Sequence, residues 1–402
     1  MNRIILIGNG FDKASNLKTA YEDFILWYFT LVFEEKLVKW DKENGVYQDS
    51  LIRITRCSKP KDFINTFKEC ESLVELGKLP RVYIQDYSPS NHNPKNPVRI
   101  IFVSSFLKEI FKSQSWGEIE GEYFKALYRL KVKVYDRNKP YSYEHKRKED
   151  IERLNKEFEF IRKTFSKYIK EVDERINFEE ESAKKFKFNF IKKCLNTPNE
   201  ETLEDYFLGP NTLFTDKPKE YFKPNTETLD KRLNNVVFIN FNYTTNLNKQ
   251  LFKFQGDDRF SFNLDEIRIH GNIAEDDERG IIFGYGDDTA KEYREIEQDG
   301  NNEYLRFMKS TQYFHDDNYK RIVSYIEEEQ FELFLAGHSL SLSDRVLLKT
   351  IVENENCKMI RFFHKGNYED YRMLVGSMTR HFDDKIKMRD KFLPYDKSDT
   401  IS

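Results

Sequence analysis

Short polar and glycine-containing motifs follow several apolar runs of this sequence, and they are the first candidates for chemistry. The run Arg3 to Ile7 ends in Gly8-Asn9-Gly10-Phe11-Asp12. Glycines between a strand and a helix let the backbone approach a phosphate, and the helix N-terminus adds positive potential. This motif therefore predicts a phosphate-binding turn, with a tight turn that binds nothing as the alternative.

Two further motifs carry amide and imidazole side chains. Asn240-Phe241-Asn242-Tyr243-Thr244 follows the strand-like run Val236 to Ile239, and His270-Gly271 closes the run Glu266 to Ile269. In an open parallel sheet, ligands bind outside the carboxyl ends of the strands, so Asn242 and His270 are expected to face one crevice. His270 would act there as a general base. The alternatives are an Asx-turn that caps a helix and a histidine with a structural role.

Glycines are concentrated at the same expected strand ends. Gly284-Tyr285-Gly286 follows the run Ile281 to Phe283, and Gly337-His338-Ser339 follows the run Glu332 to Ala336. Such glycines suit a crevice where backbone meets ligand, although loops also use glycine for conformation alone. Ser339 and the later Asp344 are candidates to bond ribose hydroxyls or to cap the next helix.

Other chemistries lack their motifs. The sequence has no tight His, Cys and Asp cluster for a metal, no GxSxG elbow and no GxxxxGK[ST] loop, so no metal is expected. Lys plus Arg (66) nearly balances Asp plus Glu (69), which argues against a global attraction to nucleic acid or anionic lipid. The basic stretch Arg129 to Lys148 is the best local candidate for nucleic acid, with a solvated surface as the simpler interpretation.

Cysteine spacing and hydropathy predict a soluble, cytoplasmic protein. The four cysteines are scattered without a CxxC pair, which favours a reducing compartment. The apolar run Ile4 to Ile7 is too short for a signal peptide or a membrane span.

The sequence pattern predicts that strands alternating with helices position these motifs. Besides Arg3 to Ile7, the expected strands are Val236 to Ile239, Glu266 to Ile269, Ile281 to Phe283, Glu332 to Ala336 and Met359 to Phe363. This alternation predicts an α/β fold with a mostly parallel sheet flanked by helices.

A large, mainly α-helical insertion is expected after the first βα unit. Residues 1–32 and 234–385 would form the nucleotide-binding domain, 33–233 the insertion and 386–402 a C-terminal tail. Within the insertion, apolar residues from Ile151 to Ile176 recur at spacings of three and four, which predicts a long amphipathic helix. It would cover the insertion's own core, with a coiled-coil seam as the alternative. Ser88 to Pro97 and Asn196 to Pro224 are expected loops.

The ordered motifs resemble the AbiH-type abortive-infection family of bacterial antiphage proteins. The resemblance rests on four segments and on Leu17 to Phe24, and it covers the first thirty or so residues and most of 234–375. The four segments are Ile5 to Asp12, Phe241 to Thr244, Ile269 to Gly271 and Gly337 to Leu340.

The same order is similar, more distantly, to the sirtuin-like Rossmann fold. This resemblance implies that Gly8 and Gly10 form the phosphate-side turn, Asn242 contacts ribose and His270 is catalytic. Gly337 and Ser339 would then contact the adenosine ribose. Two departures matter. The chain lacks the paired CxxC zinc module of deacylating sirtuins, and it has Thr244 where many sirtuin-like domains have Asp and Asn9 in place of the small middle residue of the turn.

Together these resemblances predict an antiphage protein that binds NAD and hydrolyses it to nicotinamide and ADP-ribose. Asn242 and His270 are the expected catalytic residues. The expected NAD-binding residues are Gly8, Asn9, Gly10, Phe11, Asp12, Asn240, Tyr243, Thr244, Gly271, Gly284, Gly337, His338 and Ser339.

The insertion would serve as a lid, an oligomerisation surface or a sensor for a phage trigger protein, and the isolated protein would be weakly active or silent until triggered. The alternatives are a non-catalytic nucleotide-sensing or partner-binding switch and a nucleic-acid-processing effector. Homo-oligomers are compatible with the sequence, and no membrane partner is expected.

Overall fold

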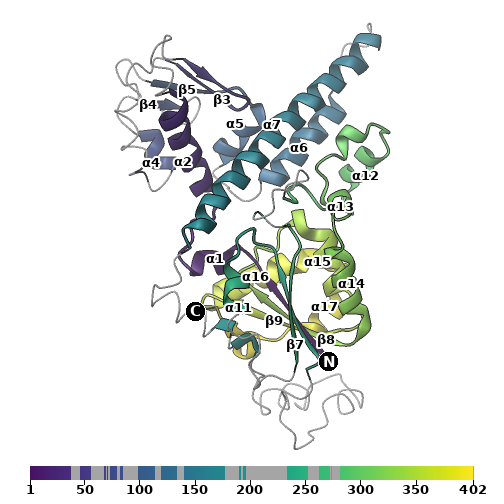
Figure 1. Ribbon diagram of the computed structural model, residues 1–402. Coiled ribbons are helices and arrows are strands. Elements are labelled where there is room, and N and C mark those ends of the chain that lie inside the picture. The colour runs from purple at the N-terminus through teal and green to yellow at the C-terminus, as the bar shows by residue number, and fades with distance from the viewer. Residues whose placement is uncertain are drawn as a thin grey trace, which may run out of the picture.

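The computed structural model describes residues 1–37, 46–55, 68, 70, 73–78, 82–84, 98–113, 119–133, 140–176, 190–191, 193–195, 233–251, 262–271, 273 and 281–401. Figure 1 shows a sheet-containing body that carries both chain ends, with a second body of helices and a smaller sheet above it. The long helix α7 (Pro140–Glu174) runs diagonally through the upper body.

The six-stranded sheet is parallel throughout. Its strands are β1 (Asn2–Ile7), β6 (Asn235–Asn240), β7 (Asn263–Arg268), β8 (Phe331–Ala336), β9 (Cys357–His364) and β10 (Asp399–Thr400). Their spatial order is β10-β9-β8-β1-β6-β7, so the first strand of the chain lies at the centre. Counted in chain order within the sheet, the strands run 6-5-4-1-2-3, which is 3-2-1-4-5-6 from the opposite edge.

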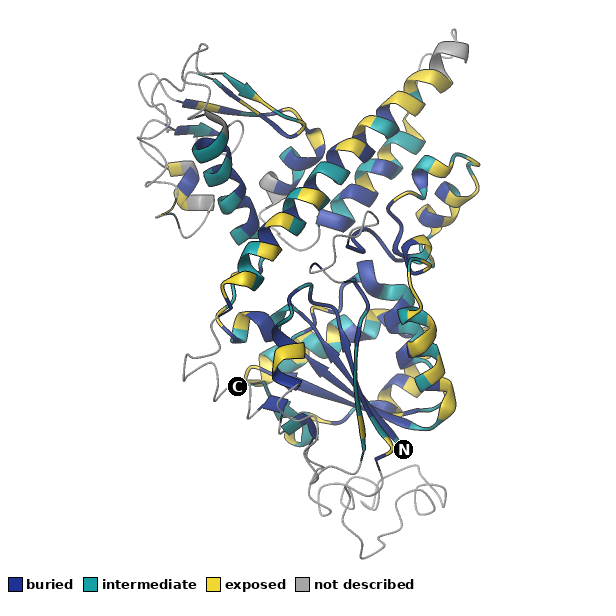
Figure 2. Ribbon diagram, viewed as in Figure 1, coloured by how far each residue is buried: buried dark blue, intermediate teal, exposed yellow. Residues whose placement is uncertain are grey.

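Both faces of this sheet are buried, because successive residues of the central strands are apolar. Ile4 and Leu6 point to one face, which the helices α14, α15, α16 and α17 cover. Ile5 and Ile7 point to the other face, which α1, α11 and residues 190–191 and 193–195 cover. The covering helices are α1 (Asn9–Ala14), α11 (Asn246–Leu251), α14 (Asn318–Glu328), α15 (Arg345–Val352), α16 (Tyr368–Met378) and α17 (Lys385–Lys391). In Figure 2 the central strands β1, β6, β8 and β9 are almost entirely dark blue.

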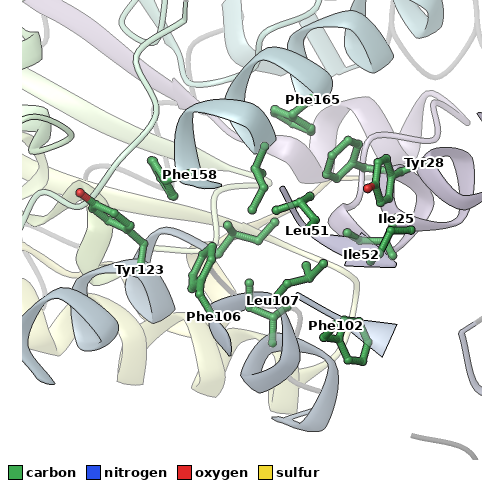
Figure 3. Close-up of a cluster of buried hydrophobic side chains, with 14 of the residues drawn as sticks. Ile25, Tyr28, Leu51, Ile52, Phe102, Phe106, Leu107, Tyr123, Phe158 and Phe165 are labelled. Carbon is green, nitrogen blue, oxygen red and sulfur yellow. The ribbon is translucent and has the colours of Figure 1, made fainter. Parts of the chain in front are cut away.

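The upper body has its own core around α7. Its other helices are α2 (Tyr21–Leu31), which continues as a π-helix (Val32–Leu37), α4 (Leu73–Lys78), α5 (Ser105–Ser113), α6 (Ile119–Val132), α12 (Lys291–Glu297) and α13 (Lys309–Gln312). A second sheet has the order β2-β3-β5-β4, formed by β2 (Tyr47–Gln48), β3 (Ile52–Thr55), β5 (Val98–Phe102) and β4 (Val82–Ile84). Figure 3 shows Phe158 and Phe165 of α7 among side chains from α2, β3, α5 and α6.

This upper core also includes residues from after the insertion. Phe283 and Phe307 pack on Phe158, with ring centroids 5.1 and 5.0 Å away. The segment 281–308 therefore joins the upper body to the sheet, although it lies between β7 and β8 in the chain.

The structure confirms the mixed α/β architecture, the mostly parallel sheet with flanking helices and the long helix around Ile151 to Ile176. The predicted strand Ile281 to Phe283 is wrong, because this buried segment pairs with no strand of either sheet and serves as a connection. The upper body is less purely helical than predicted, since it contains the second sheet. The segment 386–402, expected as a tail, contributes most of α17 and, at its end, strand β10.

Two further predictions, on two loops and on membrane spans, depend on which residues the structure describes. The loops Ser88 to Pro97 and Asn196 to Pro224 lie outside the described residues. Within the part of the chain that is described, no helix is long and apolar enough to cross a membrane.

Candidate functional site

The motifs singled out from the sequence follow the carboxyl ends of four neighbouring strands. Gly8 follows β1, Phe241 follows β6, His270 lies two residues beyond β7, and Gly337 follows β8. Because the sheet is parallel, all four segments lie at one edge, beneath the upper body (Figure 1).

The glycine turn and the loop after β8 pack backbone against backbone. A Cβ on Gly8 would lie 2.4 Å from the Cα of His338, and a Cβ on Gly10 would lie 2.6 Å from the Cα of Gly337. The amide of Gly10 donates to the carbonyl of Gly337 at 2.8 Å, and the amide of Phe11 donates to that of Gly8 at 2.9 Å. The missing Cβ atoms therefore serve contact between two loops in this structure.

Polar side chains of the turn are bound within the protein. The carboxylate of Asp12 accepts from the Thr244 hydroxyl at 2.8 Å and from the Asn246 amide at 3.0 Å. The Asn9 side chain bonds the backbone and hydroxyl of Thr19. The amide of Asn242 donates to the carbonyl of Gly8 at 3.2 Å, which ties the loop after β6 to the glycine turn.

His270 is buried, and both of its ring nitrogens face acceptors. Nδ1 lies 3.0 Å from the backbone oxygen of Phe241, and Nε2 lies 3.1 Å from Oδ1 of Asp344. The ring also stacks on Tyr243, with centroids 5.6 Å apart. Since Phe241 immediately precedes Asn242, the structure brings the two predicted catalytic residues to adjacent loops.

Asp344, in a 3₁₀ turn (Leu342–Asp344), is the centre of a buried charged cluster. Its Oδ1 also accepts from Lys309 Nζ at 2.6 Å, and its Oδ2 lies 3.6 Å from His338 Nε2. Burial alone would raise the pKa of the Asp344 carboxyl, but Lys309 and then His270 outweigh it and hold that pKa well below its usual range.

Lys309 is completely buried between two carboxylates, Asp344 and Glu120. Burial lowers the pKa of an ammonium group, but Asp344 and then Glu120 raise the pKa of Lys309 above its ordinary value. Lys309 therefore carries a charge at neutral pH.

His338 supplies a neutral ring to the same cluster. Its Nδ1 accepts from the amide of Leu340 at 2.9 Å, so its proton is on Nε2. Burial is the largest cause that lowers the pKa of His338 to about 4, and the attraction of Asp344 does not offset it.

Several predicted site residues have other surroundings. Ser339 is exposed and Gly271 is partly exposed with a positive φ, while Asn240 donates to Glu266 at 2.8 Å and accepts from the amide of Asn242. Gly284 packs on the backbone of Phe307. Asn240 and Gly284 therefore support the loops around the cluster.

Sequence inspection missed Lys309 and Glu120. Lys309 belongs to no motif and lies in the four-residue helix α13, and Glu120 lies in an amphipathic helix of the insertion. Lys309 was identified only by its contact with Asp344, which the sequence had suggested as a ribose contact or a cap, and Glu120 was identified by its contact with Lys309. The one hint was the position of Glu120 next to Ile119 on the buried face of α6.

The arrangement offers a proton-transfer group, an amide and a buried ammonium, and within the described ranges no group of three His, Cys, Asp or Glu side chains forms a metal site. A cavity of about 920 Å³ lies elsewhere, between α2 and the end of α7, with Trp27 and Tyr168 in its lining. We place the candidate site at the sheet edge, because the chemically competent side chains gather there.

The basic stretch Arg129 to Lys148 is largely paired where it is described. Lys131 and Arg147 both reach Asp299, and Lys133 lies 3.0 Å from Asp150. Residues 134–139 lie outside the described part of the chain. The paired positions offer little free positive charge to a nucleic-acid backbone.

Fold and site define a parallel α/β protein with a buried, charged cluster at the carboxyl edge of its sheet. The family model described as bacteriophage abortive infection AbiH matches residues 4–365, so this chain belongs to that family. Membership confirms the family resemblance of the motifs and indicates a role in phage abortive infection. A comparison with curated proteins gave no significant match.

Proposed function

We propose that this protein is an abortive-infection effector that binds NAD at the carboxyl edge of its parallel sheet and cleaves it to nicotinamide and ADP-ribose. The observation that carries the proposal is the convergence of Asn242 and the His270–Asp344 pair at the ends of two adjacent strands, β6 and β7.

The topology supports a nucleotide at this edge. The strand order 3-2-1-4-5-6 is that of doubly wound Rossmann sheets, which bind dinucleotides where the order reverses. Here the reversal lies between β1 and β8, and the loops that follow these strands are the Gly8–Gly10 turn and the Gly337–Ser339 loop.

The chemistry requires a base and a group that orients the ribose. Cleavage breaks the bond from the nicotinamide nitrogen to ribose C1′, and the bonding electrons leave with nicotinamide. Water then bonds to C1′ and gives a proton to Nε2 of neutral His270, which returns it to solvent. The Asn242 amide would orient the ribose or the water as positive charge develops on the ribose ring.

The contacts at the site also suggest that this conformation is a resting form. Nδ1 of His270 must carry a proton, because the carbonyl of Phe241 only accepts. Nε2 is therefore the only nitrogen that can serve as a base, and Asp344 occupies the position in front of it. Substrate access needs Asp344 and the His270 ring to separate, which agrees with an effector that waits for a trigger.

The test is NAD turnover by the full-length protein, with and without lysate from phage-infected cells. We expect nicotinamide and ADP-ribose by chromatography, rising when lysate is added. His270→Ala should lower kcat by about a hundredfold or more, as loss of a general base does, and Asn242→Ala should also lower it strongly. His364→Ala is the matched control, since this buried histidine ends β9 at the same edge of the sheet, and its side chain accepts a hydrogen bond from the amide of Gly366.

Two results would contradict the proposal. One is wild-type nicotinamide release by correctly folded His270→Ala. The other is no release by wild type in lysates of a phage against which the chain protects cells. In that case the position of Asp344 in front of Nε2 of His270 favours the second candidate, a nucleotide-sensing switch. This second candidate predicts that calorimetry detects NAD binding while no nicotinamide is released.

A further inference from the structure

The cavity between α2 and the end of α7 has no part in the proposed reaction. Its volume of about 920 Å³ is within the range of ligand sites, and its lining includes aliphatic side chains beside the rings of Trp27 and Tyr168. The two ring centroids lie 5.2 Å apart, and Trp27 is only partly buried. The hydroxyl of Tyr168 donates to the carbonyl of Lys18 at 2.6 Å, which joins α7 to the segment 16–18. An apolar side chain of a ligand can therefore be buried here.

Acidic groups beside Trp27 give the cavity a preference for a basic ligand. Among the described lining residues, carboxylates outnumber cations by four to three. Glu171 accepts from Nε1 of Trp27 at 3.0 Å. At the rim, Nζ of Lys167 lies 5.9 Å from the centroid of the Trp27 ring and 3.6 Å from Oε1 of Glu35. This ammonium group belongs to the chain itself and shows that ring and carboxylate together bind a cation.

The cavity is open on the side of its charged groups. The side chains of Glu35 and Arg175 are 43% and 77% exposed. Small-molecule sites bury most of the surface of their ligand, whereas a cavity that is open along one side can take successive side chains of a polypeptide. The geometry therefore fits a peptide segment better than an enclosed small molecule.

The end of α7 forms one wall of the cavity and also holds the loop that carries Asn242. Glu171 and Val172 line the cavity. The next residue, Asp173, accepts from the backbone amide of Thr245 at 2.5 Å and from its hydroxyl at 2.8 Å. Thr245 lies three residues after Asn242 and directly precedes α11. A displacement of the end of α7 would therefore move the loop after β6.

The segment 16–18 forms another wall and is tied to the same loop. The amide of Leu17, which lines the cavity, donates to the backbone carbonyl of Asp12 at 3.0 Å. The carboxylate of Asp12 accepts from Thr244 and Asn246, on either side of Thr245. Both walls thus hold the loop whose amide side chain the proposed reaction needs, so a ligand between them acts on both attachments.

We infer that this cavity binds a peptide segment of a partner protein in which an apolar side chain adjoins a basic one, and that the bound peptide loosens the loop of Asn242. The apolar side chain packs on Trp27 and Tyr168. The basic side chain takes the place of Lys167 between the Trp27 ring and the carboxylate of Glu35.

The walls of the cavity transmit binding to the loop. A peptide that binds best when the walls are further apart favours that state, and the bonds between Asp173 and Thr245 then break more often. Binding and loosening are independent of NAD. An effect on nicotinamide release rests on the proposed function.

The binding test uses the full-length protein with three synthetic hexapeptides, in which leucine alternates with arginine, leucine with glutamate, or glycine with arginine. Binding is read from the indole ¹H–¹⁵N signal of Trp27, which is assigned by its absence from Trp27→Phe. We expect the leucine–arginine peptide to shift this signal to saturation and the other two to leave it unchanged at the same concentrations. No shift with the leucine–arginine peptide, or an equal shift with either of the others, would overturn the inference.

Removing the resident ammonium should strengthen binding. In Lys167→Met the ring of Trp27 and the carboxylate of Glu35 lose their own cation, and we expect the affinity for the leucine–arginine peptide to rise by about twofold to fivefold. Lys163→Met is the matched control, since Lys163 lies on the same helix and pairs with Glu159, and neither belongs to the described lining. It should leave the affinity unchanged. An unchanged or lower affinity in Lys167→Met would contradict the place assigned to the basic side chain.

The loosening of the loop is measured by hydrogen exchange of residues 241–251 with mass spectrometry. The leucine–arginine peptide should speed this exchange severalfold. Asp173→Ala should speed it without peptide and leave little further increase when peptide is added. Glu174→Ala is the control, because no hydrogen bond or ion pair of its side chain is found among the described residues, and it should behave as wild type. Unchanged exchange at peptide concentrations that saturate the Trp27 signal would overturn the loosening.

Nicotinamide release by wild type with the leucine–arginine peptide separates this inference from the proposed function. Binding, faster exchange and release support both. Binding and faster exchange without release support the peptide site and count against NAD cleavage. Release in lysate from phage-infected cells by a protein that binds no peptide overturns the peptide site and leaves NAD cleavage intact.

Discussion

At the scale of single residues, the site consists of polar groups that satisfy one another. Asp344 binds Lys309 and His270 and faces His338, all at most 6% exposed. Polar and charged groups are buried only together with hydrogen-bonding or charged partners. Removing one partner leaves the remaining groups with an uncompensated desolvation free energy. The individual side chains of the cluster should therefore affect stability as well as activity.

His338 should make stability depend on pH. Its folded pKa of about 4 lies below the ordinary histidine value near 6.5. Between these pH values this histidine is protonated in the unfolded chain but remains neutral in the folded protein. The contribution of His338 to the free energy of unfolding is therefore complete above pH 6.5 and is lost as the pH falls towards 4. From pH 6.5 to 5 we expect a loss of about 2 kcal/mol in the free energy of unfolding.

Urea unfolding at several pH values measures this loss. His338→Asn keeps an acceptor for the Leu340 amide and should flatten the pH dependence by that amount. His145→Asn on α7 is the control, because its side chain is 76% exposed. An equal pH dependence in wild type and His338→Asn would rule out a buried neutral His338.

Gly337 should tolerate no side chain. Its φ is +66°, and a Cβ there would lie 2.6 Å from the backbone nitrogen of Phe11. We expect Gly337→Ala to lower the free energy of unfolding by about 2–5 kcal/mol, from left-handed strain and backbone displacement.

The control for Gly337→Ala is a glycine within a helix. A methyl group on Gly376 in α16 would meet no atom of the described residues within 4 Å, so Gly376→Ala should raise stability by up to about 1 kcal/mol. Chemical denaturation compares both variants with wild type. Equal stability of Gly337→Ala and wild type would show that the two loops do not pack as described.

At the scale of elements, α7 and the segment 281–308 join the two bodies. Phe158 of α7 lies 4.0 Å from Tyr123 of α6 between ring centroids, and it also packs on Phe283 and Phe307. The same segment supplies Gly284, whose amide binds Glu120. Packing around Phe158 therefore holds α6 where its carboxylate reaches Lys309.

Truncating Phe158 should weaken this junction. The side chain is completely buried, and replacing a buried phenylalanine with alanine costs about 3–5 kcal/mol. We expect Phe158→Ala to lose that much stability in urea unfolding. Phe314→Ala, at a residue 83% exposed, should change it by at most about 0.5 kcal/mol. Equal effects of the two substitutions would contradict the core shown in Figure 3.

The central strands β1, β6, β8 and β9 could be predicted because each is a separate, mostly apolar run with a glycine or polar residue at its end. The edge strand β10 consists of two polar residues and was missed. The strands of the second sheet were missed, since β3 and β5 are short and carry Arg53 and Arg99 among apolar residues. Ile281 to Phe283 was mistaken for a strand because a buried connection has the same composition as a buried strand.

The site was predictable only in the part that strand ends define. His270 and Asn242 follow expected strands, so their common edge follows from a parallel sheet. Lys309 and Glu120 belong to α13 and α6, and the positions of these helices depend on tertiary packing. No local sequence pattern therefore predicts the contact between the two side chains.

At the scale of the whole molecule, one body supplies the strand-end loops and the other covers them. Glu120 and Gly284 come from the covering side, while Asp344 and His270 come from the sheet side. A signal that shifts the upper body would thus change the charge around His270 without touching the sheet.

The central place of β1 has a consequence for biogenesis. Asn2 pairs with Asn235 on one side and with Phe331 on the other, so β1 leaves the ribosome before either neighbour and waits for both. At about 5–20 residues per second, that wait is on the order of tens of seconds. During it, an apolar strand of β-branched residues is exposed to self-association, and nascent chains of this protein should depend on chaperones more than those whose sheets form from adjacent hairpins.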